Sequence, residues 1–130
     1  MNIDGKDRRA AALKVAQEMM GPAFTKAILD RIEGGGLGAD AQALGFDDCF
    51  GAIWARPGLD RRARSIATIT ALISLRLAPQ LKVHLRGGMA NGLTATELEE
   101  LVMQAGAYLG YPTTAFAMGV LQEVLAERGA

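Results

Sequence analysis

The chain has 130 residues, of which half are hydrophobic but only 5% are aromatic. This length suits one domain, residues 1–130, with a core built mainly from aliphatic side chains. The 14 basic and 14 acidic residues balance. A nucleic-acid partner is not expected, since proteins that bind nucleic acids usually carry a basic surface.

The cysteine content and the N-terminus indicate a cytoplasmic protein without a membrane partner. Cys49 is the single cysteine, so it forms no internal disulfide, and we expect it to be a buried, inert thiol. No metal-ligand spacing occurs in the sequence. The N-terminus is charged, and the longest central uncharged run, Ser65–Leu75, is shorter than the roughly 20 residues of a membrane span.

Helical periodicity dominates the first half of the chain. It predicts a helix over 5–21 that ends at Gly21-Pro22, and a second helix over 24–33. The glycine-rich residues 34–38 predict a break, and a third helix is expected over 39–55, before the "RPG" turn.

Asp60 can cap the next predicted helix, 61–77. This helix has no charged residue from Ser65 to Leu75. A helix that is apolar on all sides is typically buried on all sides. We therefore expect a central helix, either within the chain or completed by a partner subunit.

The last third of the sequence contains clear helix boundaries. Pro79 can open a short helix that Asn91-Gly92 ends, and "TATE" (94–97) matches a capping box before the next helix. A final helix is predicted over 113–127 after Gly110 and Pro112. The sequence thus predicts an all-α compact bundle of six or seven helices.

His84, the single histidine, is the first candidate for chemistry because imidazole titrates near neutral pH. Gln80 and Gly88 lie four residues before and after it, so the three share one helix face. The small residue at 88 leaves room for a ligand or for a neighbouring helix. His84 is therefore a candidate general acid or base, or else a packed histidine.

Arginines and aromatic residues supply candidate binding groups. Arg64 and Arg86 could anchor a carboxylate, or could pair with surface acids. Trp54 and Tyr108 could line a pocket, although Trp54 could equally belong to the core. We predict that His84 faces a pocket lined by these aromatic residues and at least one of the two arginines. No phosphate loop, metal cluster or hydrolase elbow is present, which leaves a cofactor-free reaction or no reaction.

The region from Phe50 to Leu125 resembles the carboxymuconolactone decarboxylase family. The resemblance rests on "RPGLD", "HLRG", "NG-T--E" and "Y-G-P", which occur in this order within "WARPGLDRRARSIATITALISL" and "LKVHLRGGMANGLTATELEELVMQAGAYLGYPTTAFAMGVLQEVL". It implies the all-α alkylhydroperoxidase D-like fold, assembled as a homotrimer or homohexamer. It also implies a carboxy-lyase of aromatic compound degradation that removes CO2 from a small acidic lactone without metal or cofactor.

The resemblance also implies roles for the candidate residues. His84 would donate a proton to carbon, and Arg64, Arg86, Trp54, Tyr108 and Gln80 would bind substrate. Three positions depart from the family pattern: Gln80 stands where glutamate is frequent, Ala90 where asparagine is frequent, and Leu109 where many members have cysteine. Without a Cys-x-x-Cys pair, thiol peroxidase activity is not expected. An isomerase or cyclase on the same fold, or a non-catalytic oligomeric binding protein, stays open.

Overall fold

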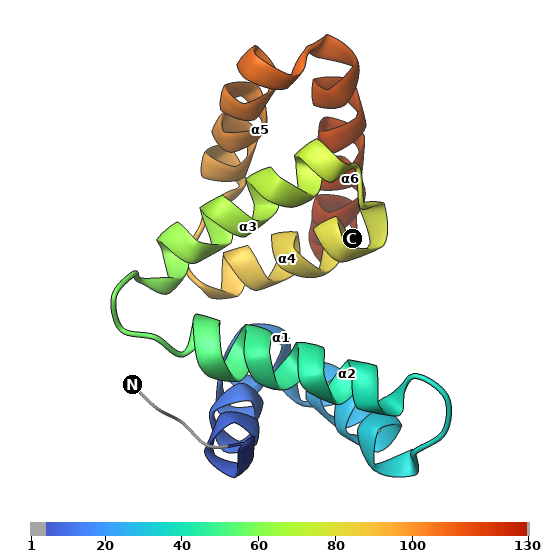
Figure 1. The fold of residues 1–130 in the computed structure, drawn as a ribbon. Helices are drawn as coiled ribbons and strands as arrows, with labels where there is room; N and C mark the ends of the chain where they lie inside the picture. The colour runs from blue at the N-terminus through green and yellow to red at the C-terminus, as the bar shows by residue number, and fades with distance from the viewer. Residues whose placement is uncertain (1–4, 130) are drawn as a thin grey trace. The chain divides into compact units, whose positions relative to one another are not determined.

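The structure is a computed structural model that describes residues 5–129, and all of its regular elements are helices (Figure 1). Six α-helices and one π-helix confirm the predicted all-α class and the expected number of helices. The chain divides into an N-terminal unit, Met1–Leu59, and a C-terminal unit, Asp60–Ala130. The prediction of one domain stays a prediction.

The N-terminal unit begins with α1 (Gly5–Gly34), which contains a kink at Gly21. Gly21 has φ 85° and ψ 176°, a conformation that glycine adopts without the steric cost of a side chain. Pro22 follows and cannot donate a backbone hydrogen bond. The predicted break at Gly21-Pro22 is therefore confirmed, with helical backbone on both sides of it.

The predicted third helix is divided into α2 (Ala39–Phe46) and the π-helix η1 (Asp47–Trp54). A π-helix forms i→i+5 hydrogen bonds, and hydrophobic periodicity over eight residues did not reveal it. Gly51 of η1 lies so close to α1 that a Cβ atom there would collide with the backbone carbonyl of Arg8. The absence of a side chain at Gly51 thus permits the close contact between α1 and η1.

Aromatic rings and charged pairs hold η1 against α1. Phe50 lies between Phe46 and Trp54, with ring centroids 5.6 and 6.2 Å away, and the three rings pack in a core with apolar residues of α1. At the edge of this core the guanidinium of Arg9 donates to both carboxylate oxygens of Asp47. Arg8 donates to Asp48 at 2.8 Å.

The C-terminal unit contains α3 (Arg61–Leu75), α4 (Ala78–Ala90), α5 (Ala95–Leu109) and α6 (Tyr111–Gly129). Its predicted caps are confirmed. The Asp60 side chain accepts from the backbone N–H of Ala63 at 2.7 Å, and Thr94 and Glu97 form a reciprocal capping box. Gly110, with φ 101°, separates α5 from α6, so Pro112 lies inside the last helix rather than before it.

Small residues let the helices of the C-terminal unit approach closely. α3 packs on α4, and α5 packs on α6 (Figure 1). A Cβ atom at Gly88 of α4 would lie 3.1 Å from Ile69 and 3.2 Å from Leu93. At Gly106 of α5 it would collide with the side chain of Thr114. The glycine four residues after His84 therefore serves close packing of α4 against α3.

The prediction that the charge-free helix is buried on all sides is wrong within the C-terminal unit. Only Ser65, Ile69 and Ile73 of α3 are buried. Ile66 is 42% exposed and Leu75 is 66% exposed. The intramolecular core covers one side of α3, because α4, α5 and α6 contact it from that side.

Candidate functional site

His84 is half-buried in the middle of α4, between the fully buried Leu81 and Leu85. Its Nδ1 atom is shielded from solvent. Burial lowers the pKa of His84 below its ordinary value of 6.5, since desolvation disfavours the charged imidazolium. The imidazole is therefore mainly neutral at pH 7.

Gln80 and Arg86 flank His84 on α4 and are both exposed. The guanidinium of Arg86 forms a forked ion pair with Glu127 of α6, at distances between 2.8 and 3.1 Å. One turn earlier Lys82 pairs with Glu123. Arg86 thus takes part in a row of ion pairs that joins α4 to α6, and this role competes with the predicted anchoring of a substrate carboxylate.

Arg64 and Arg62 lie in the first turn of α3. Arg64 is half-buried, whereas Arg62 is exposed and binds both the Gly92 carbonyl and the Glu97 carboxylate. These contacts, together with the capping box, lower the pKa of Glu97 to about 2. Arg62 links three elements structurally, and the role of Arg64 as an anchor stays a prediction.

The two predicted aromatic wall residues occupy different units. Trp54 is buried in the core of the N-terminal unit, stacked on Phe50. Tyr108 of α5 is 85% exposed and lines a groove between α3 and α5. His84 and Arg64 do not line this groove. A common pocket of His84, Trp54 and Tyr108 stays a prediction.

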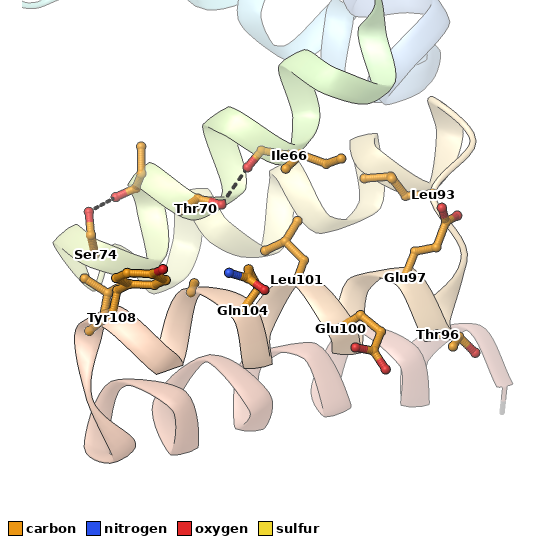
Figure 2. A pocket seen from close by; sticks show the side chains of 13 residues that line it. Ile66, Thr70, Ser74, Leu93, Thr96, Glu97, Glu100, Leu101, Gln104 and Tyr108 are labelled. Carbon is orange, nitrogen blue, oxygen red and sulfur yellow. Dashed lines mark hydrogen bonds between the residues drawn. The ribbon is translucent and has the colours of Figure 1, made fainter.

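The groove has a volume of about 680 Å³ and runs between α3 and α5 (Figure 2). Ile66, Thr70 and Ser74 line it from α3, and Glu100, Gln104 and Tyr108 from α5. Of the residues that line it, only Glu97 and Glu100 carry a charge, and both are acidic. Glu97 is paired with Arg62, and no basic residue lines the groove, so it offers no cationic group to an anionic ligand. Apart from Tyr108 we did not identify it from sequence, although the charge-free run Ser65–Leu75 was the available signal.

Cys49 is exposed, so the prediction that this residue is buried is wrong. It lies in η1, on a turn that the aromatic core leaves open to solvent. Partial desolvation of the sulfur raises the thiol pKa, and a hydrogen bond with Trp54 offsets this only in part. The thiol is therefore mainly protonated at neutral pH, as expected for an unreactive cysteine.

Neither a metal-binding cluster nor a membrane-spanning segment is found within residues 5–129. No three or more histidine, cysteine or acidic side chains of this part of the chain gather closely enough to hold a metal ion. None of its helices combines the length and the apolar character needed to cross a membrane.

The part of the chain that resembles known proteins includes the motifs described in the sequence analysis. The sequence profile of the carboxymuconolactone decarboxylase family matches residues 40–123. The 4-carboxymuconolactone decarboxylase of Acinetobacter baylyi is 32% identical over 127 residues, which cover 98% of this chain and 93% of that enzyme. The nitrosuccinic acid decarboxylase of Metarhizium robertsii is 40% identical over 76 residues, 58% of this chain and 53% of that protein.

Proposed function

Because the chain belongs to the carboxymuconolactone decarboxylase family, we propose that it decarboxylates a small carboxylated lactone similar to 4-carboxymuconolactone, without a cofactor. The observation that carries this proposal is the similarity to a 4-carboxymuconolactone decarboxylase over 98% of the chain. We propose His84 as the proton donor, because it is the chain's only imidazole and is half-buried on α4.

The proposed reaction breaks one carbon–carbon bond and forms one carbon–hydrogen bond. The bond to the departing carboxylate breaks, CO2 leaves, and the electron pair delocalises through the ring double bond into the lactone carbonyl. The resulting dienolate then takes a proton at carbon from the imidazolium of His84. Hydrogen-bond donors beside the carbonyl oxygen would stabilise the transition state for loss of CO2.

The lowered pKa of His84 predicts how activity depends on pH. A proton donor must be protonated, and burial places the pKa of the free enzyme below 6.5. We expect kcat/KM to fall as pH rises through this pKa. A bound substrate carboxylate stabilises the imidazolium, so kcat should fall at a higher pH than kcat/KM.

Arg64 is the proposed anchor for a substrate carboxylate. It is half-buried, and its planar guanidinium can form two parallel hydrogen bonds with a carboxylate. Arg86 would have to exchange its ion pair with Glu127 for the substrate in order to act as a second anchor. Substrate contacts of Trp54, Tyr108 and Gln80, a cytoplasmic location, and assembly into a homotrimer or homohexamer remain part of the proposal.

Kinetics of single variants test these roles. His84→Gln should lower kcat by about 10²–10⁴, the usual share of general acid–base catalysis, with a smaller change in KM. Arg64→Ala should mainly raise KM, because an anchoring contact acts on the ground state and the transition state alike. Lys82→Ala, a change on the same helix as His84, is the control. Near-normal turnover of His84→Gln would show that the histidine is structural.

A nitro-substituted dicarboxylic acid is the second candidate substrate. It is suggested by the relative described as a nitrosuccinic acid decarboxylase, which is 40% identical over 76 residues. A nitro group can accept the electron pair that a departing CO2 leaves behind, as a lactone carbonyl can. CO2 release from each compound, measured side by side, distinguishes the two.

Gln80 favours an alternative to decarboxylation, because family members often carry a carboxylate at this position and glutamine does not supply one. If neither acid releases CO2, an isomerase or cyclase, or a non-catalytic oligomeric binding protein, becomes the better description. Binding of the lactone without turnover, measured by calorimetry, would favour the binding protein.

A further inference from the structure

The α3 wall of the groove offers an apolar surface that the other helices of the C-terminal unit leave uncovered. Ile66 is 42% exposed. The hydroxyl of Thr70 donates to the Ile66 carbonyl at 2.8 Å, and that of Ser74 to the Ala71 carbonyl at 2.7 Å (Figure 2). Both hydroxyl protons are thus used within α3 itself. A molecule that packs against the α3 wall therefore does not need to supply acceptors for these two hydroxyl groups.

The α5 wall places its exposed side chains at regular helical spacing. Glu100, Gln104 and Tyr108 are four residues apart, all exposed, and all line the groove (Figure 2). Leu101 and Ala105 form the buried floor between them and the core. A single stripe along α5 therefore carries a carboxylate at one end, an amide in the middle and a phenol at the other end.

We propose that this groove is a contact surface between two copies of the chain, with the two α5 helices antiparallel and a two-fold axis at Gln104. In this register Glu100 and Tyr108 are equally far from the axis. Glu100 of each copy therefore faces Tyr108 of the partner subunit, and the phenol can donate to the carboxylate. The two Gln104 amides meet at the axis, where each can donate to the other.

The charges of the groove select a second copy over the anionic substrate. No basic residue lines the groove, and Glu100 would repel a carboxylate ligand, whereas the charge of Glu97 is paired with Arg62. The same stripe is complementary to itself, because its acidic end pairs with its phenol end when reversed. A two-fold contact of this kind by itself produces a dimer. Of the homotrimer and homohexamer proposed above, it is compatible only with the hexamer, built as three dimers.

Substitutions that change the charge at positions 100 and 108 test the proposed pairing of the two α5 helices. The mass of the full chain is measured by light scattering and sedimentation. Wild-type protein should sediment as a dimer or hexamer. Tyr108→Glu places two carboxylates opposite each other and should weaken the two-fold association at least tenfold. Adding Glu100→Lys creates a Lys–Glu pair in the same register and should restore it. Met103→Glu changes an exposed residue of α5 that does not line the groove, and should leave the mass unchanged.

Cross-linking tests the position of the axis independently. In a Cys49→Ser background, Gln104→Cys should form an intersubunit disulfide under mild oxidation, because the two residues 104 meet at the axis. Glu99→Cys, also exposed on α5 but outside the groove, should not. A monomeric or purely trimeric wild type, unchanged association of Tyr108→Glu, no restoration in the double variant, or no disulfide at 104 would overturn the proposal. These measurements need no substrate, so their failure is separate from failure of the proposed decarboxylation.

Discussion

Both units add ion pairs between helices and place a glycine at a close helix contact, but they fill their cores differently. In the N-terminal unit, Phe46, Phe50 and Trp54 form a row of aromatic rings, with Phe50 stacked on Trp54. In the C-terminal unit, a larger cluster of isoleucine, leucine and valine side chains fills the core. His84 and the groove both belong to the second unit.

Both units leave large apolar side chains exposed, among them Leu37, Leu44 and Ile53 in the N-terminal unit. In the C-terminal unit several lie at the end of α3, the end of α5 and the start of α6, including Leu75, Tyr108 and Tyr111. Exposed apolar residues that gather in one region commonly mark an interaction surface.

The largest effect is expected at the closest helix approach. Gly51→Ala places a methyl group against the Arg8 backbone, which cannot move cheaply, and should cost about 3 kcal/mol of unfolding free energy. Gly88→Ala meets only the side-chain methyl ends of Ile69 and Leu93 and should cost about 1 kcal/mol. Urea denaturation of both variants measures the difference.

Gly45→Ala is the control for these two substitutions. This glycine lies in α2 with no atom near its missing Cβ, so alanine should stabilise the protein by about 0.5–1 kcal/mol. Equal losses at Gly51 and Gly88 would contradict the proposed difference between a backbone and a side-chain obstacle.

A smaller effect is expected at the charged edge of the N-terminal unit. Arg9→Met leaves the partly buried Asp47 without its guanidinium and should cost roughly 1–2 kcal/mol of unfolding free energy. Lys26→Met removes an exposed pair with Asp30 and should lower the unfolding free energy much less, because solvent screens exposed charges. If both variants melt alike, the Arg9–Asp47 pair contributes no more than a surface ion pair.

The C-terminal unit should carry an acid-sensitive contact at Glu97. Its pKa is about 2 in the folded chain, against an ordinary 4.5, so its contribution to stability is present above pH 4.5 and is lost as pH falls toward 2. At pH 7 the melting temperature of the wild type should be higher than that of Glu97→Gln. This difference in melting temperature should disappear near pH 2. Glu99→Gln, an exposed change on the same helix, should show no such pH-dependent difference.

The smallest effect is expected at Cys49. Cys49→Ser should change unfolding free energy by less than about 0.5 kcal/mol and should leave turnover within tenfold, because the residue is exposed and its thiol is mainly protonated. Thermal melting and steady-state kinetics check this. A larger loss of turnover would assign the thiol a role in the reaction.

The sequence was sufficient wherever a local signal determines local structure. Gly21-Pro22, Asp60 and the Thr94–Glu97 capping box each act within one helical turn, and each predicted boundary is confirmed. The π-helix η1 was not predicted, because the spacing of its apolar residues is also compatible with an α-helix. The burial of α3 was overestimated, because a charge-free run does not specify which neighbours cover it.

Individual residues of the candidate site could be predicted from the sequence, but their arrangement in space could not. His84 was identified from its chemistry, and its partial burial and lowered pKa are compatible with a site role. The pairing of Arg86 with Glu127, 41 residues away, depends on how α4 and α6 meet. No pattern within one helix contains that information, so this competing role became visible only in the fold.

One carboxylate in the C-terminal unit links parts of the chain that are distant in sequence. Glu97 accepts from the Thr94 backbone and from Arg62, and Arg62 also binds the Gly92 carbonyl. The start of α3, the loop after α4 and the start of α5 are thereby tied to one another. In hydrogen-exchange terms, the amide of Glu97 should open together with that of Ala63 as one cooperative unit rather than by independent fraying of helix ends.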